Sequence, residues 1–160
     1  MRRYALFGIF IILFNISCSS GDSSLKDGYY TAEMGEFNKY GWKDYVTIRI
    51  SGGKIIHVEY NSFNTSGFIK SWDMDYMRNM NAKNGTYPNS FRRKYGGKLL
   101  EKQGTEEIDP ISGATASYHT FLLLADEVLE NARKGNTETK LVYLSGDTMG
   151  NYVPIQEDGN

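Results

Sequence analysis

The sequence feature that most constrains this chain is a long amphipathic segment towards its C-terminal end. From about Ser112 to Lys134, apolar residues recur at the three- and four-residue spacing that lines one face of a helix. The members of this apolar stripe are Tyr118, Phe121, Leu122, Ala125, Val128, Leu129 and Ala132. Glu130 can pair with Lys134 one turn later, and Gly135 follows as a terminator. The pattern predicts a helix over 112–134 whose apolar face packs against the rest of a folded domain.

The first part of the chain after residue 27 has the pattern of strands. Residues 28–33 are rich in tyrosine and threonine, and residues 45–50 alternate apolar with polar side chains. A further β-rich run, 54–60, follows Ser51-Gly52-Gly53, and two such runs joined by glycines predict a hairpin. His57 in that run has no ligand partner two residues away and is expected to be a plain sheet position. We therefore expect an antiparallel meander.

Helical spacing returns twice between the meander and the long helix. It predicts a short helix over 71–84 and another from Pro88 to about Gly104. The apolar positions are Trp72, Tyr76 and Met80 in the first, and Phe91, Tyr95 and Leu99 in the second. The basic run Arg92-Arg93-Lys94 is expected to form a solvated face, and residues 139–144 could add one more strand. The chain should therefore have an α+β fold, in which an antiparallel β-sheet packs with about three α-helices.

Composition narrows the classes of function. The 160 residues suit a single domain, and 18 basic residues against 19 acidic ones, with no longer basic run than 92–94, do not support nucleic-acid binding. A single cysteine excludes a disulfide within the monomer and a zinc site made of several thiolates. The two histidines share no ligand spacing, so no metal site is expected. We expect a monomer.

The N-terminus has the features of an export signal. Arg2 and Arg3 precede an apolar run, 4–14, which is too short to cross a hydrocarbon core of about 30 Å as a lasting helix. The following Asn15-Ile16-Ser17-Cys18 resembles the lipobox of bacterial lipoproteins, although Asn15 stands where leucine is usual. This resemblance implies cleavage after residue 17 and lipid on Cys18. The alternative is an ordinary signal peptide with an incidental cysteine.

These features divide the chain into four parts. Residues 1–17 are the expected signal peptide, and 18–26 are a Ser/Gly/Asp-rich flexible linker after lipidated Cys18. Residues 27–136 form the single domain, and 137–160 form a C-terminal strand and tail. The protein should therefore be lipid-anchored to the bacterial cell membrane or outer membrane and exposed outside the cytoplasm. Two or three acyl chains are needed, since one chain holds a protein only reversibly.

The stretch from Asp109 to Ser117 carries the chemistry. Its small residues let a ligand approach the backbone at the start of the long helix, where unpaired N–H groups and the helix dipole favour a phosphate. Ser112 or Asp109 is expected to cap this helix, and Thr115 would then place its hydroxyl beside the anion. The alternative is that these residues serve only as caps.

The segment Asp109-Pro110-Ile111-Ser112-Gly113-Ala114-Thr115 resembles the Asp-x-x-(Ser/Thr)-Gly-Ala-Thr flavinylation motif of the FMN-binding domain family. The resemblance implies that a flavin transferase moves FMN from FAD onto the Thr115 hydroxyl and leaves a covalent phosphoester. It also implies that Asp109, Ser112, Gly113 and Ala114 surround the phosphate.

The similarity extends over about residues 27–136 and points to small, membrane-anchored FMN-binding lipoproteins. Asn64-Thr65-Ser66-Gly67 stands where the flavin subunits of related ion pumps carry Glu-Thr-x-Gly, so Asn64 and Gly67 are expected near the flavin ring. The side chains considered as walls for the ring, although a place in the core is favoured for each, are Trp42, Phe63, Phe68, Trp72 and Tyr76. Lys70 is expected either to stabilise the anionic reduced ring or to be solvent-exposed.

The resemblance therefore implies an electron-transfer flavoprotein at the cell envelope, a redox carrier rather than a substrate-specific enzyme, with an unidentified donor and acceptor. The principal alternative is a surface lipoprotein that acts as a binding module, with Thr115 unmodified. A hydrolase that uses Ser112 or Ser117 with His119 is disfavoured, because the chain has no nucleophile-elbow motif.

Overall fold

A computed structural model of the chain describes residues 24–144. The elements run in the order β1 (Gly28–Met34), β2 (Trp42–Ser51), β3 (Lys54–Asn64), the short 3-10 helix η1 (Lys70–Trp72), α1 (Met74–Asn84), α2 (Pro88–Lys102), α3 (Thr115–Lys134) and β4 (Lys140–Val142). The predicted signal peptide, Cys18, most of the expected linker and the tail after residue 144 lie outside the described residues.

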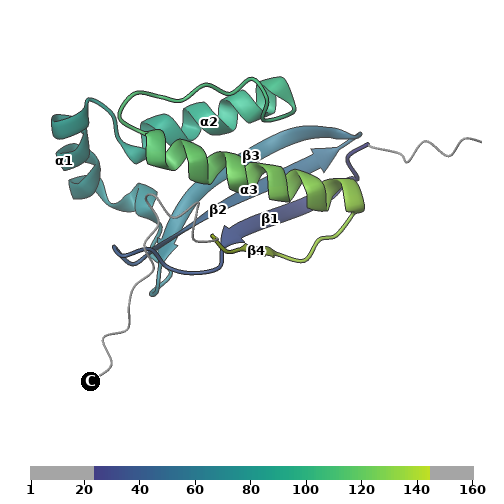
Figure 1. Cartoon of the computed structure of the whole chain (residues 1–160), viewed down its shortest axis with the longest axis horizontal. Coiled ribbons are helices and arrows are strands. Elements are labelled where there is room, and N and C mark those ends of the chain that lie inside the picture. Colours follow the sequence, from purple (N-terminus) through teal and green to yellow (C-terminus); the bar gives the residue numbers. More distant parts are fainter. Residues whose placement is uncertain (1–23, 145–160) are drawn as a thin grey trace, which may run out of the picture.

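The four strands form one mixed sheet in the order β3-β2-β1-β4. The strands β1, β2 and β3 pair antiparallel, as the predicted meander requires, whereas β4 pairs parallel to β1. The helices α2 and α3 lie across one face of the sheet, and α1 lies at one end of the molecule (Figure 1). The α+β prediction is confirmed. The parallel pairing of β4 arises because α3 carries the chain back across the sheet before that strand begins.

The predicted hairpin is present between β2 and β3. Gly52 and Gly53 have φ of 60° and 71°, the left-handed conformation that a two-residue turn of this kind needs at both central positions. The pairing register shifts between Arg49 and Ile50. This shift leaves Ile56 as an extra residue in β3, which bends this strand locally.

Two helix boundaries differ from the predicted ones. Helix α3 begins at Thr115 rather than Ser112, because Gly113 has φ of 77° and cannot belong to a right-handed helix. Helix α2 ends at Lys102, and Gln103, with φ of 61°, takes the left-handed cap position expected of Gly104.

The core joins both long helices to the sheet. Phe121 of α3 is fully buried; its ring centroid lies 5.4 Å from that of Tyr95 of α2 and 5.0 Å from that of Tyr60 of β3. Burying an aromatic or aliphatic side chain contributes about 1.5–3 kcal/mol to stability. This three-ring contact fixes the first half of α3 beside α2 and β3, where the residues with chemical potential gather.

Candidate functional site

The start of α3 is an exposed turn without a side-chain cap. The N-cap residue is Ala114, which is buried, and no side chain bonds to the helix end. The expectation that Ser112 or Asp109 caps α3 is therefore wrong, because the left-handed Gly113 stands between these residues and the first turn. Thr115 is exposed at the first helical position, as expected for a residue whose hydroxyl is accessible.

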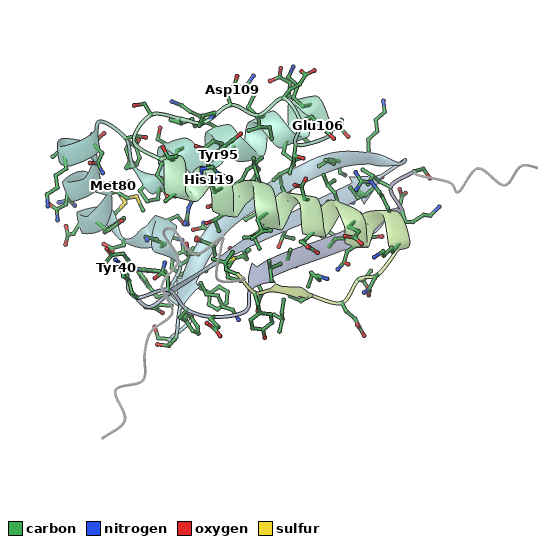
Figure 2. All side chains as sticks on the ribbon, in the orientation of Figure 1. Tyr40, Met80, Tyr95, Glu106, Asp109 and His119 are labelled. Carbon is green, nitrogen blue, oxygen red and sulfur yellow. The ribbon has the colours of Figure 1, made fainter. Side chains whose placement is uncertain are left out.

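The segment before α3 is held by hydrogen bonds and a close backbone contact within the chain. The Tyr95 hydroxyl accepts a hydrogen bond from the Ile111 N–H, and the Tyr118 hydroxyl donates to the Ile108 carbonyl. A Cβ on Gly113 would lie 3.1 Å from the Asn84 carbonyl oxygen, so the backbone approaches the end of α1 closely. Figure 2 shows Asp109 on this connection, above α2, and His119 on α3. The fold itself accounts for the small residues of the segment.

The remaining residues expected around a flavin lie on the turn after β3 and near α1. The Asn64 side-chain oxygen accepts hydrogen bonds from the backbone N–H groups of Ser66 and Phe68, both at 3.0 Å, and so organises a turn. Gly67 in that turn has φ of 80°. Of the proposed ring walls, Phe68 and Tyr76 are 40% exposed. Flavin contact at these residues stays a prediction.

Lys70 is buried beside two aromatic rings, so of its two expected roles the solvent-exposed one is wrong, and contact with a reduced flavin stays a prediction. The Lys70 Nζ lies 4.9 Å from the ring centroid of Trp42 and 4.6 Å from that of Tyr76. Such contacts attract a cation. Burial, together with the positive charge of Arg92, lowers the pKa of Lys70 to about 8. Trp42 and Tyr76 thus both make cation–π contacts with the Lys70 amine.

Sequence reasoning missed a buried polar cluster centred on Arg92. The Arg92 guanidinium donates from Nη2 to Asp44 Oδ1 at 2.6 Å and from Nη1 to Asn61 Oδ1 at 3.1 Å. Ser62 donates to the same Asp44 oxygen and accepts from Arg92. The Arg92 guanidinium carbon also lies 4.9 Å from the ring centroid of Tyr60.

The solvated face expected for Arg92-Arg93-Lys94 is correct for two residues and wrong for Arg92. Arg93 and Lys94 are exposed, whereas Arg92 is only 6% exposed. Arg92 precedes the buried Tyr95 and Gly96 by three and four residues, so all three share the inward face of α2. This spacing is the signal from which its burial could have been suspected.

Two buried side-chain atoms lack a hydrogen-bond partner among the described residues, Arg92 Nε and Asn89 Oδ1. Both residues line one groove of about 290 Å³ between α2 and β3. The other groups of Asn89 and Arg92 are satisfied, since Asn89 Nδ2 donates to the Ser71 carbonyl at 2.9 Å. An unmet buried donor or acceptor costs about 1–3 kcal/mol. The two residues that carry these unmet groups therefore border the same groove.

A second depression lies on the other side of α2, where Asp109 and Ile111 contribute to its wall. Four of its six charged side chains already pair within the chain: Lys98 with Glu101 at 3.0 Å, and Lys102 with Glu107 at 2.5 Å. The groove beside β3 is therefore the better candidate for a ligand.

Residues 24–144 hold neither a metal-ligand cluster nor a membrane-spanning helix. Across residues 24–144, no group of three or more histidine, cysteine, aspartate or glutamate side chains gathers in a way that could hold a metal ion. None of the helices in the same range has the length and apolarity to cross a membrane. His119, proposed as a partner of Ser112 or Ser117 in a hydrolase, is exposed, and its ring lies 5.2 Å from that of Tyr118.

Comparison with known proteins places the chain among small lipoproteins. No known family profile matches the chain. The chain belongs to the family of the 15 kDa lipoprotein of Treponema pallidum (strain Nichols), to which it is 38% identical over 116 residues, covering 72% of this chain and 82% of the relative.

Two solved structures are also similar. The CPE2226 protein from Clostridium perfringens is 40% identical with a TM-score of 0.72, covering 76% of this chain and 99% of that one. A Clostridium thermocellum protein solved in solution is 30% identical with a TM-score of 0.48, over 68% of this chain and 92% of the other.

Membership of the FMN-binding domain family is therefore a wrong prediction. Neither the lipoprotein relative nor the CPE2226 protein is named as a flavin protein, and no family profile matches the chain. The physical reason lies in the motif itself. Gly113 is required by a positive φ and a close backbone contact, and Ala114 by burial, so the fold demands these residues without reference to a cofactor.

Proposed function

We propose that this protein is a lipoprotein of the bacterial cell envelope, anchored through lipid on Cys18, that binds a ligand in the groove between α2 and β3. The N-terminal cysteine motif and the relationship to a lipoprotein support the anchor. A single observation carries the binding function: Arg92 and Asn89 line the same groove, and each holds a buried side-chain atom without a partner, the donor Arg92 Nε and the acceptor Asn89 Oδ1.

The groove combines features expected of a binding site. Arg92 is held rigidly by Asp44, Asn61 and Ser62, so its remaining N–H is oriented before a ligand arrives. A ligand that supplies an acceptor and a donor would restore two hydrogen bonds at little cost in side-chain order. Arg93 and Gly97 at the rim are exposed, so the groove opens to solvent.

Site-specific photocrosslinking in intact cells of the native host tests the binding function. A benzophenone side chain at Arg93, which lines the groove, should yield a crosslinked product, whereas the same group at Lys98, outside the groove, should not. Gly97→Trp, which fills the groove from α2, should remove the product. Equal crosslinking from both positions, or none from Arg93, would contradict the proposal.

The anchor is tested separately by metabolic labelling with an alkyne fatty acid. Cys18 is the sole cysteine, so Cys18→Ala should remove the lipid label and move the protein from the membrane fraction to the soluble fraction. Retention of label and membrane binding by that variant would contradict lipidation at Cys18.

A second candidate function does not depend on family membership: covalent FMN on Thr115 and electron transfer at the envelope. The observation in its favour is that the Thr115 hydroxyl is exposed on the uncapped first turn of α3, where N–H groups and the dipole favour a phosphate. Intact mass after coexpression with a flavin transferase tests it. Thr115→Ala should remove an FMN adduct and Ser112→Ala should keep it; a wild-type mass without FMN excludes this candidate.

A further inference from the structure

We infer that the groove takes an extended peptide segment of a partner protein, which adds to the outer edge of β3 as a fifth strand. This inference rests on the proposed binding function and names its ligand. Three features of the described residues carry it: an open edge on β3, the space left by α2, and the pair of unsatisfied side-chain groups.

The strand β3 is the outer strand of the sheet, since it pairs with β2 on one side and with no other named strand. Near the start of β3, the side-chain amide of Gln103 occupies the place of a neighbouring strand's peptide group. The Gln103 carboxamide accepts from the Ile55 N–H at 2.7 Å and donates to the Ile55 carbonyl at 3.0 Å. These are the two hydrogen bonds that a neighbouring strand would make.

The far end of β3 is closed as well. Ser62 N–H donates to Asn61 Oδ1, and Asn64 N–H donates to the Phe68 carbonyl, each at 3.0 Å. Because alternate residues of a strand direct their backbone groups to the same side, Val58 and Tyr60 direct theirs to the open edge, as Ser62 and Asn64 do. The window from Ile56 to Asn61, which no strand pairs with on this side, is roughly 20 Å long at about 3.4 Å per residue. Val58 and Tyr60 both line the groove there; Val58 is partly exposed, and Tyr60, 4% exposed, lies deeper.

Helix α2 leaves space beside this window. A Cβ on Gly96 would lie 3.4 Å from Val58 Cγ1, so the helix packs directly against the strand at that point. A Cβ on Gly97 would meet nothing within 4 Å, and Gly97 lines the groove. A strand flanked at one side by a helix is the geometry in which extended peptides bind by β-addition.

The unsatisfied groups match a peptide unit. Arg92 Nε needs an acceptor and Asn89 Oδ1 needs a donor, and a peptide unit supplies a C=O and an N–H. A simple anion would satisfy only Arg92, whose charge Asp44 already balances at 2.6 Å. Glu59 and Arg93, both exposed on the rim, contribute one negative and one positive charge, so the rim does not select an anion. A neutral extended backbone is therefore favoured over a phosphate or carboxylate ligand.

The test uses the full mature chain in detergent, with linear peptides selected on it from a random phage-displayed library. Each backbone nitrogen of a selected peptide is then methylated in turn. β-Addition predicts that methylation at every second position weakens binding by about tenfold or more while the positions between have little effect, because only alternate N–H groups face β3. Hydrogen exchange at the Val58 and Tyr60 amides should slow when the peptide binds. Neither measurement needs an altered protein.

A matched pair of variants places the peptide in the groove. Gly97→Trp should abolish binding, and Lys98→Trp, one residue along α2 and outside the groove, should not. Peptides that bind without the alternating pattern, or that still bind Gly97→Trp, would overturn the inference. Dimerisation that Gly97→Trp prevents would assign the edge to a second copy. Crosslinking from Arg93 to a small molecule, with no peptide selected, would keep the proposed function and overturn this inference.

Discussion

Replacing Arg92 by methionine removes the charge at the centre of the buried cluster while keeping most of the side-chain volume. The change leaves Asp44, only 8% exposed, without its cation and with one of its hydrogen bonds, from Ser62, intact. Removing one partner of a buried ion pair costs about 3–5 kcal/mol. Since Ser62 still donates to the carboxylate, we expect a loss near the lower limit, about 3 kcal/mol in the free energy of unfolding.

Urea unfolding followed by circular dichroism measures this loss. Arg93→Met, one residue along on the exposed face of α2, is the control and should change stability by about 0.5 kcal/mol or less. The double variant Arg92→Met with Asp44→Leu should be about 1–3 kcal/mol more stable than the sum of the single losses, because neither charge is then left alone. A loss below about 1 kcal/mol for Arg92→Met would refute the reasoning and return Arg92 to a solvated face.

Three further predictions concern α2 and Lys70, all measured as free energies of unfolding in urea. Gly97→Ala should stabilise the protein by up to about 1 kcal/mol. Gly96→Ala should stabilise it less, because the new Cβ would lie 3.4 Å from Val58 Cγ1. Equal gains in stability would contradict the close packing of α2 on β3. Gln103→Ala should destabilise the protein by about 1 kcal/mol more than Gln103→Gly, because both variants lose the hydrogen bonds to Ile55 but only glycine relieves the φ of 61°. Equal losses would contradict a strained cap. The pKa of Lys70 lies near 8 in the folded state and near 10.5 in the unfolded state. Between these values the unfolded state binds more protons, so the free energy of unfolding should rise with pH from 8 to 10. Lys70→Met should lack this rise and should be the more stable protein at pH 7. A parallel pH dependence of both proteins would show that Lys70 is not buried as a cation.

The elements themselves could be predicted from local patterns. The apolar stripe of α3, the alternation in β2 and the glycine pair at the hairpin each depend on residues within a few positions of one another. The meander followed, since short glycine turns join antiparallel neighbours. The local pattern predicts the start of α3 three residues too early, because the left-handed conformation of Gly113 goes with a contact to the end of α1 that the local sequence does not show.

The candidate site could not be predicted in the same way. Arg92 and Asp44 are 48 positions apart, and the groove is made by an edge of β3 and a face of α2 that come together only in the folded protein. The motif at residues 109–115 lies in the loop before α3, which Tyr95 and Tyr118 hold by hydrogen bonds. The conformation of this loop explains the small residues of the motif.

Sequence alone determined which segments are strands and helices and suggested an exported, lipid-bearing N-terminus, because periodicity and short signals are local. Tertiary structure alone decided which arginine is buried, which backbone edge is open and which polar atoms lack partners, because burial depends on what the rest of the chain brings against each side chain.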